Sequence, residues 1–283
     1  MITVTGATGQ LGRLVVENLL ERGVPATEIT AAVRTPDKAA DLGVAVRQAD
    51  FDEPDTLADA FAGTDKLLLI STNGSDDLRI AQHRAVVAAA AEAKVGQLVY
   101  TSIVDAAQNP LALARTHRTT EGVIRDADLP YVFLRNNWYA ENYTATLQDA
   151  VGRGGLVGSA QDGRIAAATR DDYAAAAAAV LATNGHEGAV YELTGDTAWT
   201  LAELAHEVSK QTGKEISYTD LPPEQYQQIL LGAGLPDFFA EVLVDAEVKI
   251  ADGALAEATP DLSRLIGRPT TSLPDAVATA LKS

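Results

Sequence analysis

The sequence predicts an α/β fold: a doubly wound parallel sheet with a smaller, interleaved C-terminal α/β lobe. Two observations lead to this prediction. Short apolar runs alternate with segments of helical length as far as residue 134, and a glycine-rich stretch joins the first run to the first of these segments. Strands that alternate with helices form right-handed βαβ units, which build a parallel sheet covered on both faces.

Six apolar runs of four to six residues, partly β-branched, are predicted to be buried parallel strands. They cover residues 2–5, 29–33, 44–47, 66–70, 97–101 and 131–134. The segments between them are predicted to be helical and cover residues 11–22, 36–40, 56–61, 76–93 and 112–127. In the first of these, Leu11, Val15 and Leu19 recur at helical spacing and give the helix one apolar face.

The second half of the chain is less regular. Turns are predicted at residues 152–155 and 161–163, and a helix over 171–182 has Asp171 or Asp172 as its N-cap. A helix over 200–211 starts with Thr200 and Glu203 at the spacing of a capping box. The remaining predicted elements are strands at 189–193 and 216–219 and helices near 223–231, 237–244 and 273–281.

These elements suggest two parts. Residues 1–150 are predicted to form the sheet domain. We expect the strand at 189–193 to return to the sheet of this domain. Residues 151–283 would then form mainly a small substrate-binding lobe over the carboxyl edge of the sheet.

The composition limits what the protein binds. The 283 residues carry 22 basic and 39 acidic side chains, and the net charge of −17 disfavours nucleic acid and anionic membranes as partners. The absence of cysteine excludes disulfides and thiolate catalysis. No apolar stretch approaches the roughly 20 residues of a membrane span, and the chain starts directly with a strand. We therefore expect a cytoplasmic protein. The four histidines are dispersed along the chain and match no spacing of metal ligands, so no metal site is predicted.

The first loop has the pattern of a phosphate-binding turn. It contains Gly6, Thr8, Gly9, Gln10, Leu11 and Gly12. Glycine adopts positive φ at a tight turn, lets backbone N–H groups approach a pyrophosphate, and allows close contact between helix and strand. The helix N-terminus adds the positive end of its dipole at the same place. The alternative is a tight turn without a ligand, but a loop placed after residue 5 of a βαβ chain favours a dinucleotide.

The second predicted strand ends in Arg34, where a fold that uses NAD usually carries an acidic residue. A guanidinium binds a 2′-phosphate in a bidentate manner, and Lys38 lies four residues further on. Arg34 therefore predicts a preference for NADP(H) over NAD(H). The alternative is a solvated surface arginine.

Two further strand ends supply candidate cofactor contacts. Asp50 and Phe51 follow the third strand, where they would border the adenine; the alternative is a loop that caps the next helix. Ser71, Thr72 and Asn73 follow the fourth strand, and small polar side chains at this edge suit contact with the cofactor backbone.

The Tyr–Lys pair of short-chain dehydrogenases is missing. His117 and Glu121 stand at the matching place, four residues apart on one helical face, after Ser102. Ser102 is a candidate to bond a substrate oxygen. His117 is a candidate proton donor near neutral pH, and a surface ion pair with Glu121 is an equal alternative.

The loop after the sixth strand is rich in amides and aromatic rings. Asn137, Trp138, Tyr139 and Asn142 lie there, at the strand end where open α/β sheets bind ligands. Aromatic faces stack on flat ligands and Asn both donates and accepts hydrogen bonds, so we expect the nicotinamide near Tyr139 and Asn142. The alternative is a polar loop with two buried rings. Arg170 is a further candidate contact to phosphate or substrate, with a cap or ion pair as its alternative.

Several of these segments resemble a known family. The segments TGATGQLG and KLLLIST, the strand end at Arg34, and residues 134–143, 168–174, 190–196, 198–200 and 265–270 look like the NAD(P)H:quinone oxidoreductase type 2 group of the NmrA-like, atypical short-chain dehydrogenases. The resemblance spans nearly the whole chain. It implies reduction of a quinone by two electrons from NADPH, with NADH weaker, and it implies cofactor contacts at Gly6–Gly12, Arg34, Ser71–Asn73, Asn137–Asn142 and Arg170.

The chemistry of quinones agrees with the missing Tyr–Lys pair. A quinone accepts hydride readily, and its reduced oxygen takes a proton from water, so two flat rings must be positioned and no strong acid is required. We therefore expect direct hydride transfer without flavin. The rival hypothesis is an NmrA-like redox sensor that holds NADP without turnover. The sequence does not fix the oligomeric state, and a homodimer is the default expectation because two-fold assemblies are the commonest.

Overall fold

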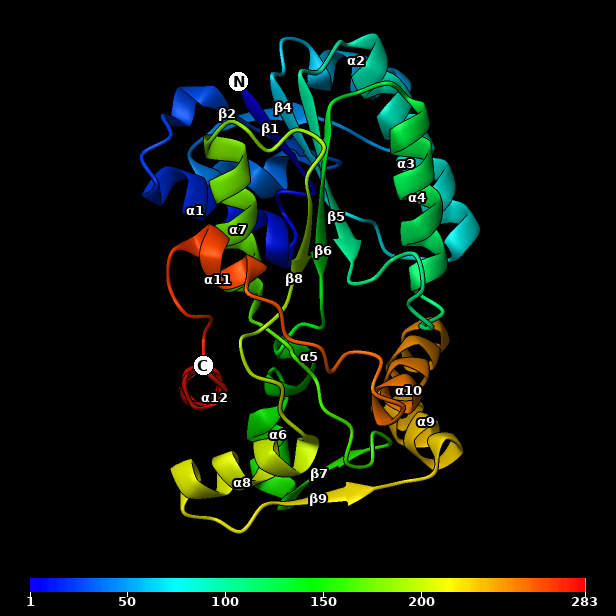
Figure 1. The fold of residues 1–283 in the computed structure, drawn as a ribbon, viewed down its shortest axis with the longest axis vertical. Coiled ribbons are helices and arrows are strands. Elements are labelled where there is room, and N and C mark those ends of the chain that lie inside the picture. The colour runs from blue at the N-terminus through cyan, green and yellow to red at the C-terminus, as the bar shows by residue number, and fades with distance from the viewer. Residues whose placement is uncertain (283) are drawn as a thin grey trace.

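The computed structural model describes residues 1–282 and confirms the α/β fold. Its main sheet has seven parallel strands in the order β3-β2-β1-β4-β5-β6-β8, and Figure 1 shows β5, β6 and β8 side by side with their carboxyl ends towards the rest of the chain. These strands are β1 (Ile2–Thr5), β2 (Ile29–Val33), β3 (Ala45–Gln48), β4 (Lys66–Leu69), β5 (Gln97–Ile103), β6 (Tyr131–Asn136) and β8 (Val190–Leu193). The strand order reverses at β1 and β4, where an open sheet forms its ligand crevice.

Helices cover both faces of the main sheet (Figure 1). One face carries α1 (Gln10–Glu21), α7 (Arg170–Ala182) and α11 (Asp261–Ile266), and the other carries α2 (Asp55–Phe61), α3 (Asp76–Glu92) and α4 (Ala114–Asp126). Two short 3-10 helices, η1 (Ala26–Glu28) and η2 (Pro36–Leu42), precede β2 and β3. Each face has its own apolar core, because the inner strands are buried on both sides. The edge strand β3 is only half-buried, so the prediction of a buried strand at residues 44–47 was wrong in this respect.

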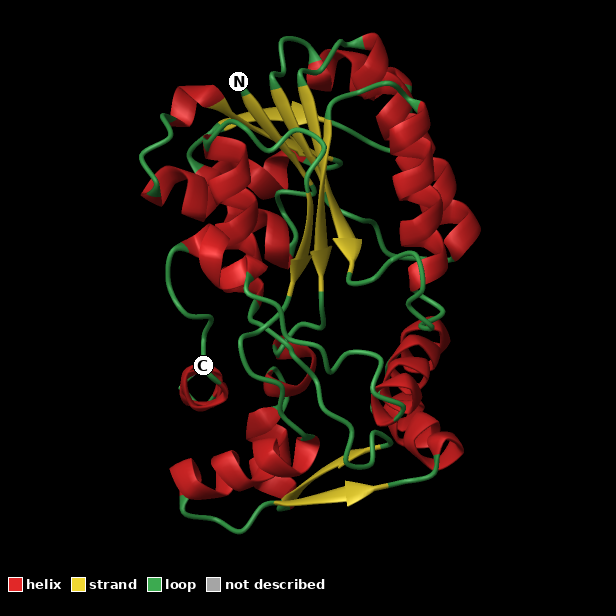
Figure 2. Ribbon diagram, in the orientation of Figure 1, coloured by secondary structure: helices red, strands yellow, loops and turns green. Residues whose placement is uncertain are grey.

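The rest of the chain forms a lobe beyond the carboxyl ends of the strands (Figure 2). Its parallel strand pair is β7 (Gly155–Gly158) and β9 (Ser217–Asp220). Its helices are α5 (Glu141–Thr144), α6 (Leu147–Arg153), α8 (Leu201–Thr212), α9 (Pro223–Gly232), α10 (Asp237–Ala251) and α12 (Leu273–Ala280). A third apolar core joins this lobe to the end of β5 and the loop after β6.

The second half of the chain departs from the sequence predictions in several places. The elements α5, α6, α11 and β7 were not predicted. The N-cap of α7 is Thr169, whose hydroxyl accepts from the Asp172 backbone N–H, so Asp171 and Asp172 as N-caps were wrong. The two aspartates lie in the first turn instead, where their charge also suits the helix dipole. The capping box of Thr200 and Glu203 is confirmed, and β8 lies in the main sheet beside β6.

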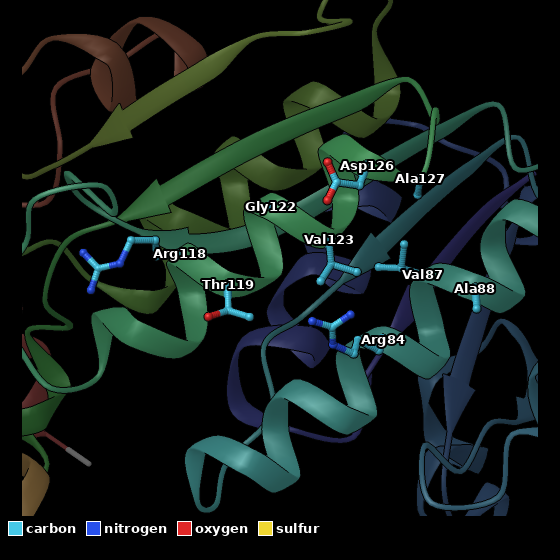
Figure 3. Close-up of a pocket in the computed structure, with 9 residues that line it drawn as sticks. All are labelled: Arg84, Val87, Ala88, Arg118, Thr119, Gly122, Val123, Asp126 and Ala127. Atoms are coloured by element: carbon cyan, nitrogen blue, oxygen red, sulfur yellow. The ribbon is translucent and has the colours of Figure 1, made fainter.

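A groove of about 500 Å³ opens on the outer side of α3 and α4. Figure 3 shows its lining side chains, which come from these two helices and include Arg84, Arg118 and Asp126. None of its lining residues belongs to the candidate site predicted above, which lies at the strand ends.

Candidate active site

The glycine loop after β1 exposes backbone donors at the start of α1. Gly6 has φ +60°, and a Cβ on Gly12 would lie only 2.3 Å from the Gly6 carbonyl oxygen. Gly9 is the N-cap of α1 but supplies no capping side chain, and no acidic residue lies in the first turn. The first N–H groups of α1 are therefore left to bind an anion from outside the chain.

Arg34 lies at the end of β2, exposed to solvent. Among residues 1–282 it forms no ion pair, and its side chain makes no hydrogen bond to a protein group. Because no carboxylate pairs with it, its guanidinium is available to bind an anion. Asp50 accepts a hydrogen bond from the Asp52 N–H at 3.1 Å, so this carboxylate shapes its own loop, and Phe51 packs partly against the core.

The end of β4 is held in place by hydrogen bonds from neighbouring elements. The Ser71 N–H donates to Thr101 Oγ1 at 2.9 Å, and the Thr72 N–H donates to His83 Nε2 at 3.1 Å. Asn73 is exposed beyond them. The Ser71 hydroxyl accepts from Arg79 Nη2 at 2.9 Å and the Thr72 hydroxyl lies 3.2 Å from His83 Nε2, so both hydroxyls are bonded to side chains of α3.

Ser102 and Glu121 form a buried pair. Ser102 Oγ donates to Glu121 Oε1 at 2.6 Å, and Arg135 binds both oxygens of the same carboxylate at 2.8 and 2.7 Å. Burial raises the pKa of Glu121, but the hydrogen bonds from Arg135 and Ser102 outweigh burial and hold this pKa below its usual value. Glu121 is therefore a carboxylate, and the hydroxyl hydrogen of Ser102 points to it.

His117 is buried and has different partners from Glu121. Its Nδ1 lies 2.9 Å from the Tyr100 hydroxyl, and its Nε2 lies 3.4 Å from Nη2 of Arg79. The alternative of a surface ion pair between His117 and Glu121 was wrong, because both side chains are buried and they are not bonded to each other. Burial, with Arg79 nearby, lowers the pKa of His117 well below its usual value, so the imidazole is uncharged near pH 7.

Three candidates from the loop after β6 and the start of α7 come together. The Arg170 guanidinium lies 4.7 Å from the centre of the Tyr139 ring, and its Nη2 donates to Asn142 Oδ1 at 3.2 Å. Glu141 holds the Arg170 backbone N–H at 2.9 Å. Glu141 also pairs with the Arg170 guanidinium at 3.5 Å, so Arg170 forms the ion pair that was its alternative assignment. The cluster presents an aromatic face and an amide beside the strand ends, which suits a flat ring.

Two other candidates in this loop point to the interior. The Asn137 side chain donates to the Leu255 carbonyl at 3.2 Å and accepts from the Trp138 N–H at 2.7 Å. Trp138 is buried, and its Nε1 has no hydrogen-bond partner among the described residues. Asn137 therefore holds the chain where β6 ends, and only its neighbours Tyr139 and Asn142 join the cluster with Arg170.

Three polar groups beneath the strand ends are not among the site residues predicted from the sequence. Arg79 and His83 lie on the buried face of α3, and Tyr100 lies within the wholly buried β5. The spacing of Arg79 and His83, one helical turn apart, was the available signal. Among residues 1–282 no group of histidines and carboxylates is arranged to hold a metal ion, and no helix is long and apolar enough to cross a membrane.

Comparison with known proteins gives a consistent result. A model described as the NmrA-like family matches residues 1–274. Quinone oxidoreductase 2 of Escherichia coli (strain K12) is 48% identical over 280 residues, which cover 98% of this chain and 97% of that protein.

Solved structures extend this similarity to the fold. The structure of an Escherichia coli NADPH-dependent quinone oxidoreductase in complex with NADPH has a TM-score of 0.95 and 47% identity, covering 99% of this chain and 100% of that one. A Citrobacter sp. triphenylmethane reductase in complex with NADP(H) also has a TM-score of 0.95, with 39% identity and the same coverage.

Proposed function

This chain belongs to the NmrA-like family, and we propose that it is an NADPH-dependent quinone oxidoreductase. The observation that carries the proposal is the near-full-length similarity, at 48% identity, to the Escherichia coli quinone oxidoreductase. The site agrees with this function, because an uncapped helix N-terminus and the unpaired Arg34 lie at neighbouring strand ends.

The residues present fit NADPH as the cofactor. A Cβ at Gly12 would collide with the Gly6 carbonyl, so only glycine lets α1 approach the loop and present its N–H groups to a pyrophosphate. Arg34, with Lys38 exposed beside it, would hold the 2′-phosphate, which makes NADH the weaker cofactor. Asp50 and Phe51 would border the adenine, and Ser71, Thr72 and Asn73 would line the cofactor backbone. The proposed contacts also include Thr8, Gly9, Gln10 and Leu11, whereas the side chains of Asn137 and Trp138, which the sequence analysis included, point inward and are left out.

The cluster of Tyr139, Asn142 and Arg170 would position the reacting rings. NADPH supplies a hydride, which together with one proton from water converts a quinone to its hydroquinone. Tyr139 offers an aromatic face, and Asn142, fixed by Arg170, would hold the nicotinamide carboxamide. The protein needs to align the two rings more than to supply an acid. We therefore propose that hydride passes directly from NADPH to the quinone, without flavin or metal.

Ser102 and His117 take supporting positions in this proposal. The Ser102 hydroxyl hydrogen is directed to Glu121, which leaves its oxygen lone pairs as acceptors. His117 is an uncharged imidazole at neutral pH and is therefore a hydrogen-bonding group more than a proton donor. Both residues lie below the strand ends, where they would fix the floor of the site.

The test is quinone-dependent oxidation of NADPH by protein freed of any bound flavin. We expect NADPH to disappear and hydroquinone to form in a one-to-one ratio when benzoquinone is present, with no oxidation when benzoquinone is left out. Binding of NADPH without any turnover on a panel of quinones would contradict the proposal and support the rival redox-sensor hypothesis.

A further inference from the structure

Arg79 is a charged side chain buried beneath the strand ends. It lies in the first turns of α3 and is only 3% exposed. Its Nη2 donates to Ser71 Oγ at 2.9 Å and lies 3.4 Å from His117 Nε2. Burying a charge carries a large free-energy cost unless the charge is paired, so this placement requires an explanation.

The charge of Arg79 has no counter-ion within the described chain. No ion pair involves Arg79 among residues 1–282, and its buried Nε has no hydrogen-bond partner. The nearby carboxylate of Asp76 is engaged elsewhere: it accepts from Thr116 Oγ1 at 2.6 Å and pairs with Arg115 at 3.5 Å. Burial lowers the pKa of Arg79, yet an arginine keeps its proton in proteins, so a unit positive charge remains.

The neighbouring histidines do not share this charge. Arginine can only donate, so His117 Nε2 is the acceptor and its Nδ1–H faces the Tyr100 hydroxyl. The Thr72 N–H donates to His83 Nε2, which likewise places the His83 proton on Nδ1, toward Thr120. Burial lowers the pKa of His83 to about 3, with Arg79 contributing. Both imidazoles are therefore neutral, and Arg79 is the charged member of the network.

The network lies directly under the crevice. Ser71 follows β4, which pairs with β1 at the point where the strand order reverses. The Ile70 N–H donates to Thr5 Oγ1 at 3.0 Å, immediately before the glycine loop. A dinucleotide bound across this loop would therefore pass over Ser71, and Arg79 contacts Ser71 from below.

We propose that Arg79 is a positioning residue that selects the redox state of the cofactor: its buried, unpaired charge disfavours the positively charged nicotinamide of NADP⁺ relative to the neutral ring of NADPH. This inference rests on the proposed function. The charge would promote release of the oxidised dinucleotide after turnover, so that NADPH replaces it. Unit charges still repel one another through a protein interior, where the effective dielectric constant is about 20, so we expect a change in the dissociation constant on the order of tenfold.

The test measures dissociation constants of NADPH and NADP⁺ by calorimetry, without quinone. The proteins are the wild type, Arg79→Gln, Arg79→Lys and Arg84→Gln; Arg84 is exposed on the same helix, so its variant makes the same change of net charge. The wild type, Arg79→Lys and Arg84→Gln should bind NADPH roughly tenfold more tightly than NADP⁺. Arg79→Gln should bring the two dissociation constants to within about threefold of each other.

Three results would overturn the inference. If Arg79→Gln weakens the binding of NADPH and of NADP⁺ equally, Arg79 is a phosphate contact or a purely structural residue. If Arg84→Gln changes the ratio of the two dissociation constants as much as Arg79→Gln does, the effect is one of net charge. A wild-type protein that binds NADP⁺ as tightly as NADPH would overturn it even if Arg79→Gln does not fold. A wild type that binds neither dinucleotide would contradict the proposed function itself.

Discussion

At the scale of single residues, Glu247 in α10 is a buried carboxyl. It is 1% exposed and accepts a hydrogen bond from the Ser159 N–H. Among the described residues it forms no ion pair. Burial raises the pKa of Glu247 to about 7, against an ordinary value of 4.5, and the Asp220 carboxylate contributes in the same direction. The folded protein therefore holds this proton more tightly than the unfolded chain does.

This raised pKa predicts a pH-dependent stability. Stabilisation from the protonated Glu247 is complete below about pH 4.5 and is lost as the pH rises through about 7. Glu247→Gln keeps an acceptor for Ser159 and cannot ionise. The difference in free energy of unfolding between Glu247→Gln and the wild type should therefore shift in favour of the variant by up to about 3 kcal/mol as the pH rises from 5 to 8.

Denaturant unfolding at several pH values checks this prediction. The control is Glu241→Gln, which changes an exposed side chain on the same helix. A stability difference between Glu247→Gln and the wild type that does not vary with pH would show that Glu247 keeps an ordinary pKa.

At the scale of elements, the glycine loop and α1 depend on close backbone contact. A Cβ at position 12 would lie 2.3 Å from the Gly6 carbonyl oxygen and 2.8 Å from Ala7 Cα. Gly12→Ala should therefore lower the free energy of unfolding by about 1–3 kcal/mol and weaken NADPH binding, because α1 must move away from the loop. Thermal unfolding and a binding titration would measure the two effects.

A second glycine provides the matched control. Gly122 lies inside α4, and a Cβ there would meet nothing within 4 Å. Gly122→Ala should raise stability by about 0.5–1 kcal/mol, because alanine has the higher helix propensity, and should leave NADPH binding unchanged. Equal effects of the two substitutions would mean that the contact at Gly12 is not tight.

The elements that the sequence predicted well are those with a strong local signal. Strands β1 and β2 match the predicted runs because they are continuous, apolar and buried on both faces. The short α5 and α6 were missed, since a helix of four or seven residues depends on tertiary contacts. For the same reason the sequence placed Asn137 with Tyr139, whereas hydrogen bonds to residues distant in sequence turn Asn137 inward.

At the scale of the whole molecule, the candidate site lies at the carboxyl edge of the main sheet, between its two helical layers and the lobe (Figure 1). Candidates far apart in the sequence lie at this edge because parallel strands end there. Sequence spacing alone could not show that Arg170 would contact Tyr139 and Asn142. A domain boundary near residue 150 stays a prediction. Helix α7 and strand β8 come after this boundary in the sequence, yet both pack with the main sheet.

The assembly of the molecule is also a prediction. We expect a homodimer, because closed two-fold assemblies are the commonest among oligomers. Light scattering coupled to size-exclusion chromatography should give a mass twice that of the 29.7-kDa chain at micromolar concentration. A mass equal to one chain over the same concentration range would show a monomer.

The central claim is that the unpaired Arg34 beside the glycine loop selects the phosphorylated dinucleotide. Calorimetric titration of the wild type and Arg34→Ala with NADPH and with NADH tests this claim most directly. The wild type should bind NADPH more tightly. Arg34→Ala should lose roughly tenfold or more of its affinity for NADPH, as expected for a charge-assisted bidentate contact, while its affinity for NADH stays nearly unchanged. An Arg34→Ala protein that keeps the wild-type preference for NADPH would contradict the account.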